Sequence, residues 1–131
     1  MATPVEMMYL LVFCLLSVVF LGFTGRLHAA AVQVTNVAQS AARAASLAPT
    51  PTAAKQAALD AVARSPLSTR CQGGGRVTMQ WTRSAIGSWQ GGTVTVAVAC
   101  TVRNQSLTGV WSPGTRVVTM SDTQFVDRYR R

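Results

Sequence analysis

An uncharged, strongly apolar run over residues 7–25, MMYLLVFCLLSVVFLGFTG, is the feature that most constrains this chain. Glu6 precedes the run and Arg26 follows it. As an α-helix rising about 1.5 Å per residue, the run would cover most of the ~30 Å hydrocarbon thickness of a bilayer. The sequence therefore predicts one membrane-spanning helix near the N-terminus, and hence a single-pass protein of the cell membrane.

The predicted helix continues beyond the apolar run. No proline or capping signal follows Arg26 before residue 49, and alanine, valine and glutamine fill much of residues 27–48. Small or apolar side chains recur on one face at spacings of three and four: Leu27, Ala31, Val34, Ala38, Ala41, Ala45 and Ala48. The other side is polar and should be wet or partly covered by the rest of the chain: Gln33, Asn36, Gln39, Arg43 and Ser46.

A second, shorter helix is predicted over residues 52–64. Pro49 and Pro51 end the first helix, because proline removes a backbone donor and disfavours helical geometry in the residue before it. Either Thr50 or Thr52 can act as the N-cap, and Ser65 with Pro66 provides the stop. We expect this helix to return antiparallel along the first one.

From Cys71 onward the pattern becomes that of β-strands. The runs 76–81 and 93–102 follow glycine-rich turns, and in the second run the valines and Cys100 fall on one face. A third strand is expected within residues 116–125. The predicted fold class is α+β, with a long helix, a short helix and a meander of about three antiparallel strands whose apolar face needs a cover.

These elements suggest a division of the chain into three parts. Residues 1–26 form the membrane and assembly helix, residues 27–66 an exposed helical stalk with its return helix, and residues 67–131 a small extracytoplasmic β domain.

The three cysteines favour one disulfide. Cys14 lies inside the apolar run, whereas Cys71 and Cys100 flank β structure and are the expected pair. Closing a loop of about thirty residues would stabilise the domain by about 3.5 kcal/mol in the chain-entropy model. Because disulfides persist in oxidising compartments, the C-terminal domain is expected outside the cytoplasm. No Cys-x-x-Cys spacing or Cys/His cluster indicates a metal site.

The N-terminus conflicts with this topology. By the positive-inside rule, Arg26 and Arg43 would favour a cytoplasmic C-terminus. The opening MATPVE also has no Lys or Arg before the apolar run, unlike an ordinary secretory leader. We therefore expect that a basic leader precedes Ala2 in the native product and is removed.

The net charge of +8 comes from twelve Lys and Arg against four Asp and Glu. This balance permits contact with anionic wall polymer, lipid headgroups or nucleic acid without selecting among them. Nucleic acid is the less favoured partner, because its recognition needs a basic stripe on a recognisable module. With His28 as the only histidine and so few acids, the chain offers little for acid–base catalysis, and we expect no enzymatic activity and no cofactor.

Three tryptophans are many for a small β domain. Trp81 alternates with Val77 and Met79 and is expected in the core. Trp89 and Trp111 are expected in loops, where a tryptophan can either anchor a partner or fold back over a thin sheet. The sequence leaves both roles open.

In order and spacing, the chain resembles TadE-like proteins, the minor pilin or pseudopilin subunits of tight-adherence (Flp-type) pilus systems, in the versions found in high-GC Gram-positive bacteria. The features that carry the resemblance extend over most of the chain: Thr3, Val5 and Glu6 before an apolar helix, the stretch QSAARAAS at 39–46, Cys71, the strand at 93–102 and the ending VDRYR at 126–130. Pro4 and the missing basic leader depart from the family pattern.

The resemblance implies a role in the assembly or initiation of a type IV pilin-like surface pilus. Its implied partners are other pilin subunits, the pilus-assembly platform and, during maturation, a prepilin peptidase. With Ala2 as the first mature residue, Glu6 stands at mature position five, where the family's glutamate attracts the α-amine of an adjacent subunit. The other interpretation of Glu6 is a headgroup-level residue that marks the membrane boundary.

A different class of function remains as the alternative. The chain would then be a monomeric, membrane-anchored extracytoplasmic binding module. Its β domain would bind wall polymer, a surface or DNA, while the helix would only tether it.

Overall fold

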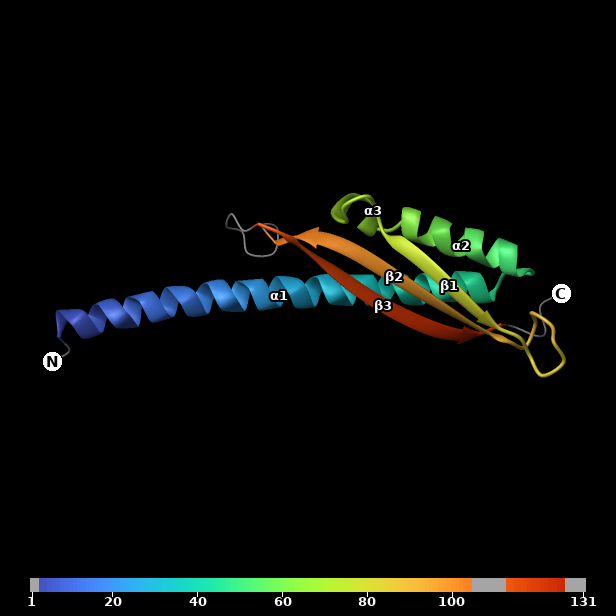
Figure 1. Cartoon of the computed structure of the whole chain (residues 1–131), viewed down its shortest axis with the longest axis horizontal. Helices are drawn as coiled ribbons and strands as arrows, with labels where there is room; N and C mark the ends of the chain where they lie inside the picture. Colours follow the sequence, from blue (N-terminus) through green and yellow to red (C-terminus); the bar gives the residue numbers. More distant parts are fainter. Residues whose placement is uncertain (1–2, 105–112, 127–131) are drawn as a thin grey trace.

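The computed structural model describes residues 3–104 and 113–126. Their helices are α1 (Pro4–Ser46), α2 (Pro51–Ala63) and α3 (Leu67–Arg70), and their strands are β1 (Arg76–Thr82), β2 (Thr93–Arg103) and β3 (Thr115–Phe125). The expected α+β fold is confirmed. The first half of α1 projects alone from a body that is formed by its second half and the other elements (Figure 1).

Helix α1 is continuous over 43 residues, as the sequence predicted. It begins after Thr3, with Pro4 in its first turn, where proline's missing N–H is not needed. It ends at Ser46 with Leu47 as its C-cap, just before Pro49. The apolar run and the alanine-rich extension are therefore two parts of one rod.

The strands form one antiparallel sheet in the order β1-β2-β3. The register places Val77 opposite Val98 and Cys100 opposite Val118. In β2, the alternating residues Val94, Val96, Val98 and Cys100 are buried, which confirms the predicted apolar face. Strand β3 begins at Thr115, one residue before the expected range.

The two longer helices cover the apolar face of the sheet. Helix α2 runs back along the second half of α1, so the expected antiparallel return is confirmed (Figure 1). Buried residues of α1, α2 and the sheet belong to one hydrophobic core. The predicted stalk and β domain therefore fold together around that core.

The core stripe of α1 is wider than expected. Val34, Ala38, Ala41 and Ala45 are buried as predicted, and Leu27, Ala31 and Ala48 are partly buried. Val37 and Ala42 are buried as well, because α2 and the sheet flank α1 on adjoining sides. Ser46, assigned to the polar side, is also buried, and its Oγ donates to the carbonyl oxygen of Arg43 at 2.8 Å.

Local details of the second helix differ slightly from the prediction. Thr50 is its N-cap, since its Oγ1 accepts a hydrogen bond from the Ala53 amide at 3.2 Å, and Pro51 occupies the first turn. The single turn α3 was not predicted. It buries Leu67 and leads directly into Cys71.

Candidate functional site

The projecting half of α1 is the largest apolar surface among the described residues. Its large side chains are exposed all round, with Phe13 at 70% and Phe20 at 67%. The helix is long and apolar enough to cross a membrane. An apolar surface of this size needs a cover of lipid or other protein chains. We call residues 4–25 the uncovered half of α1.

Two hydroxyl groups within the uncovered half are satisfied by the helix itself. The Ser17 hydroxyl donates to the Phe13 carbonyl oxygen at 2.8 Å, and the Thr24 hydroxyl donates to that of Phe20 at 2.9 Å. These bonds to the preceding turn remove the cost of a bare donor in hydrocarbon. Cys14 is an exposed free thiol in the same segment, as predicted.

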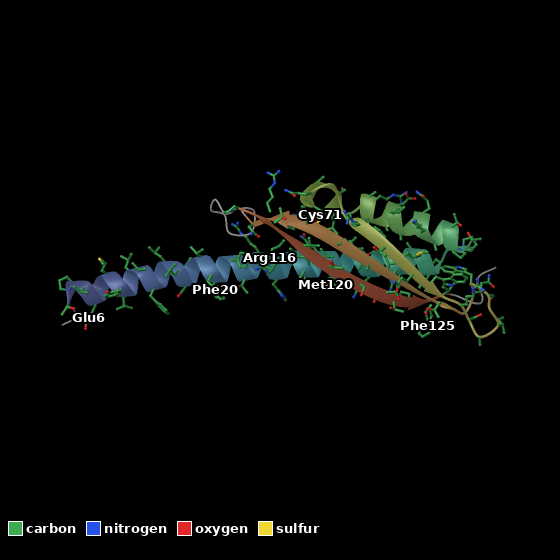
Figure 2. All side chains as sticks on the ribbon, in the orientation of Figure 1. Glu6, Phe20, Cys71, Arg116, Met120 and Phe125 are labelled. Atoms are coloured by element: carbon green, nitrogen blue, oxygen red, sulfur yellow. A yellow bond between two sulfur atoms is a disulfide. The ribbon has the colours of Figure 1, made fainter. Side chains whose placement is uncertain are left out.

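Glu6 lies near the free end of this half and closes a capping box (Figure 2). Its Oε2 accepts a hydrogen bond from the Thr3 amide at 2.8 Å, and the Thr3 hydroxyl accepts one from the Glu6 amide at 3.4 Å. The positive end of the helix dipole also stabilises the negative charge of this carboxylate. Glu6 thus has a local structural role that the sequence interpretation missed.

The Thr-x-x-Glu spacing of Thr3 and Glu6 is the signal that could have revealed this cap. A carboxylate has room for several hydrogen bonds, so the cap leaves acceptor capacity for a second partner. Ala2, whose α-amine the pilin interpretation requires, lies outside the described residues.

Glu6 adjoins an apolar strip. Tyr9, Leu10 and Phe13 follow it at helical spacing, and the four side chains line one shallow hollow on the helix surface. A second helix packed along this strip would meet the carboxylate at its end. The arrangement suits contact between subunits, and it suits insertion into a bilayer equally well.

Cys71 and Cys100 form the predicted disulfide, with their Cα atoms 5.2 Å apart. Both are buried. The bridge joins the segment after α3 to the middle of the sheet, and the Gln72 amide adds a hydrogen bond to the Thr101 carbonyl oxygen at 2.9 Å. The disulfide therefore ties the end of α3 to the central strand β2.

Trp89 is a packing residue in this structure, so the partner-contact role that the sequence left open for it is not supported. It is only 7% exposed, and its Nε1 donates to the Ala48 carbonyl oxygen at 2.8 Å. Its ring lies 5.2 Å from that of Trp81, which packs partly buried against the core as expected. Trp111 lies outside the described residues.

Replacing Trp89 with Phe is expected to lower the free energy of unfolding by about 1 kcal/mol, because it keeps the aromatic packing but removes the hydrogen bond to Ala48. Denaturant unfolding of the full chain in detergent, followed by circular dichroism, measures the change. Trp81→Phe is the matched control. The buried Trp81 Nε1 has no hydrogen-bond partner among the described residues, so its removal should be neutral or stabilising. Equal losses in both variants would contradict this account.

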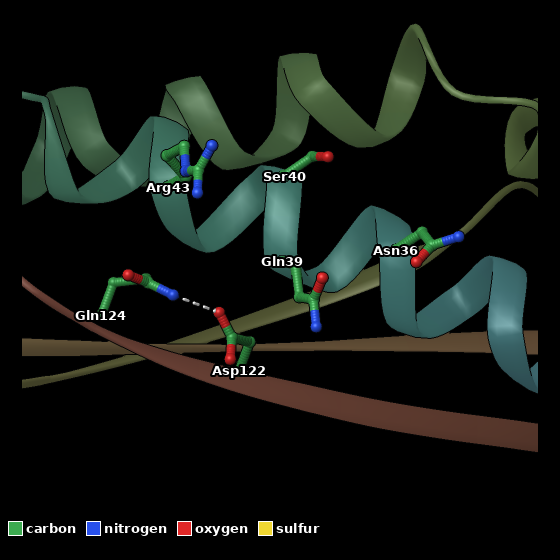
Figure 3. Close-up of a pocket in the computed structure, with 6 residues that line it drawn as sticks. All are labelled: Asn36, Gln39, Ser40, Arg43, Asp122 and Gln124. Carbon is green, nitrogen blue, oxygen red and sulfur yellow. Dashed lines mark hydrogen bonds between the residues drawn. The ribbon is translucent and has the colours of Figure 1, made fainter.

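A polar groove of about 420 Å³ lies between α1 and β3 (Figure 3). Helix α1 contributes Asn36, Gln39, Ser40 and Arg43, and β3 contributes Asp122 and Gln124. The Gln124 amide donates to Asp122 Oδ2 at 2.7 Å. The sequence predicted a polar side of α1 that includes Asn36, Gln39 and Arg43, but it did not predict a groove. It missed the strand side, although strict alternation from Val118 places Asp122 and Gln124 on the same face.

Metal binding gains no candidate site from the described ranges 3–104 and 113–126. No group of three or more His, Cys, Asp or Glu side chains there is placed to hold a metal ion. His28 is exposed on α1, just past the uncovered half.

The residues predicted to matter are therefore spread over the molecule. Glu6 lies at the free end of α1, whereas Trp89 and the disulfide lie in the body. Comparison with protein-family models, with curated proteins and with solved structures finds no match to this chain.

Proposed function

We propose that this protein is a minor pilin or pseudopilin that acts in the assembly or initiation of a tight-adherence (Flp-type) surface pilus. The observation that carries the proposal is the division of α1 into two halves with opposite surroundings. One half packs into a small disulfide-bonded body, and the other half exposes its large apolar side chains as far as Leu21. The resemblance of the residues to TadE-like proteins supports the same assignment.

A subunit of this kind needs a helix that is stable in two environments. Before assembly, lipid would cover the uncovered half, and after assembly the helices of neighbouring subunits would cover it. The internally bonded hydroxyls of Ser17 and Thr24 suit both environments, because they require no partner outside the helix. The body would be carried outside the filament core.

Glu6 would provide the specific polar contact between subunits in this proposal. A carboxylate next to hydrocarbon is costly unless it has partners. The Thr3 amide provides one partner, and the α-amine of an adjacent subunit would provide a second, oppositely charged one. The prepilin peptidase that exposes such an amine, and the platform that inserts the subunit, are the further partners of this proposal.

The alternative is a tethered binding module with its body outside the cytoplasm. The basic charge and the loop tryptophans mildly favour this module, and the burial of Trp89 weakens the second of these arguments. The polar groove between α1 and β3 is the feature that still favours it, since hydrogen-bonding groups could hold a surface polymer there. For this reason the functional test has to separate assembly from tethering.

Mild cross-linking of source cells, followed by purification of this chain, distinguishes an assembly subunit from a tethered module. We expect the major pilin to co-purify, because the subunits share helix contacts in the membrane or the filament. A matched membrane protein with one apolar helix controls for random collision. Recovery of the chain without any pilin, at normal expression, would favour the tethered module.

A further inference from the structure

Four arginines gather where the uncovered half of α1 meets the body. Arg26 directly follows the apolar run, Arg70 ends α3, Arg103 ends β2, and Arg116 is the second residue of β3. All four side chains are exposed. They come from four different elements, so the fold brings them to one end of the body. We call them the junction arginines.

Two of the junction arginines line a groove of about 480 Å³ between α1 and α3. Arg26 contributes from α1 and Arg70 from α3, while Ala29, Ala30 and Val102 supply small or apolar wall. The short alanine side chains leave space between the two guanidinium groups. A guanidinium binds phosphate oxygens through paired N–H donors, so this groove suits a phosphate group with an apolar attachment.

The contact of Arg116 with α1 shows where along that helix the junction arginines lie. Its guanidinium carbon lies 5.6 Å from the centre of the Phe23 ring, and Phe23 belongs to the last turn of the apolar run. Figure 2 shows Arg116 beside α1, at the start of the body and just past Phe20. If α1 crosses a membrane, the junction arginines lie at the level of the lipid headgroups.

Only one carboxylate of the described residues lies near α3, and the four junction arginines outnumber it. This is Asp60, in the last turn of α2, which lines a pocket with Ser68 of α3. Glu6 is at the opposite end of the apolar run. Asp122 is six residues along β3 from Arg116, about 20 Å in an extended strand. The potential at the junction is therefore positive, which complements a negatively charged membrane surface.

We propose that the junction arginines bind the phosphate groups of anionic phospholipids in the leaflet next to the body. The proposal rests on α1 crossing a membrane and does not require incorporation into a pilus. Lipid binding would hold the body against the membrane surface in one orientation. It also gives Arg26 a function at the membrane boundary that does not depend on which side of the membrane the body occupies.

Spin-labelled lipids test the proposal on the full chain. The protein is reconstituted in phosphatidylcholine vesicles that contain a trace of nitroxide-labelled phosphatidylglycerol or nitroxide-labelled phosphatidylcholine. Electron paramagnetic resonance then gives the fraction of each label held at the protein. We expect roughly a five-fold preference for phosphatidylglycerol, which corresponds to the attraction between one arginine and an anionic membrane surface. The preference should be smaller at high salt, because salt screens this attraction.

Paired variants locate the site. The double variant Arg70→Gln and Arg116→Gln should lose most of the preference. The double variant Lys55→Gln and Arg83→Gln removes the same charge from the far end of the body and should retain the preference. Equal loss in the two double variants would overturn the proposal, because the effect would then come from net charge alone.

Three further outcomes would also overturn it. One is equal association of the two labelled lipids with a protein that is fully incorporated. Another is loss of the preference on adding inorganic phosphate at constant ionic strength, which would assign the groove to a soluble phosphate compound. The third is failure of the chain to enter vesicles, which would remove the membrane anchor itself. A failed pilus assignment, by contrast, would leave the lipid preference intact.

Discussion

Replacing both bridged cysteines, Cys71→Ala with Cys100→Ala, is expected to lower the free energy of unfolding of the body by about 3.5 kcal/mol. The bridge spans 29 residues of sequence, and cross-linking a loop of that length removes conformational entropy from the unfolded chain. Because domains of this size have little stability to spare, we expect a large part of the population to be unfolded at 37 °C. Denaturant unfolding in detergent measures the loss.

Cys14→Ala is the matched control for the disulfide variant. Cys14 is exposed on the uncovered half of α1 and is remote from the core, so its removal should leave the stability of the body unchanged. Alkylation of the non-reduced protein, followed by mass mapping, should label Cys14 alone. Labelling of Cys71 and Cys100 without reductant would contradict the pairing and the oxidising compartment inferred from it.

Glu6→Gln is expected to reduce piliation at least about ten-fold while leaving membrane insertion intact. An opposite charge about 4 Å from the Glu6 carboxylate would contribute about 4 kcal/mol at an effective dielectric constant of 20, and the amide loses most of that attraction. Glutamine at this position still completes a capping box with Thr3, so the start of the helix is preserved. The variant therefore removes the charge and keeps the cap. Pilus counts and membrane fractionation measure the two effects.

Asp60→Asn provides the control for the loss of a carboxylate. Asp60 is exposed on α2 and accepts a hydrogen bond from the Gln56 side chain at 3.1 Å, far from the apolar helix surface. The change should leave piliation near normal. Normal piliation in the Glu6→Gln strain, with the protein at its usual level, would mean that Glu6 serves only as a helix cap and boundary residue.

Periodicity explains why much of the fold could be predicted from the sequence. A uniformly apolar run and a stripe at spacings of three and four both indicate one helix, and strict alternation around Val96 indicates a buried strand face. Cys100 lies on that same face, which is why its pairing with Cys71 could be predicted. These signals are local, so they do not depend on how the elements meet.

The missed features depend on contacts between distant segments. Trp89 follows a glycine and serine in a loop, and its buried side chain packs in the core and donates a hydrogen bond to Ala48, more than forty residues away. The position of Arg70 in the same groove as Arg26 likewise depends on how α3 docks beside α1. The cap formed by Thr3 and Glu6 is different, because its spacing was visible in the sequence, and only the functional interpretation of Glu6 obscured it.

The most direct test of the proposed function is a photoreactive residue placed at Phe13, in the uncovered half of α1, in source cells. If this half packs against other pilin helices, illumination will join the chain to a second pilin subunit. The same residue at Leu59, which is partly exposed on α2, serves as the control and should give no such product. Phe13 products that contain lipid but no pilin, from cells that make pili normally, would contradict the account and leave α1 as a simple membrane anchor.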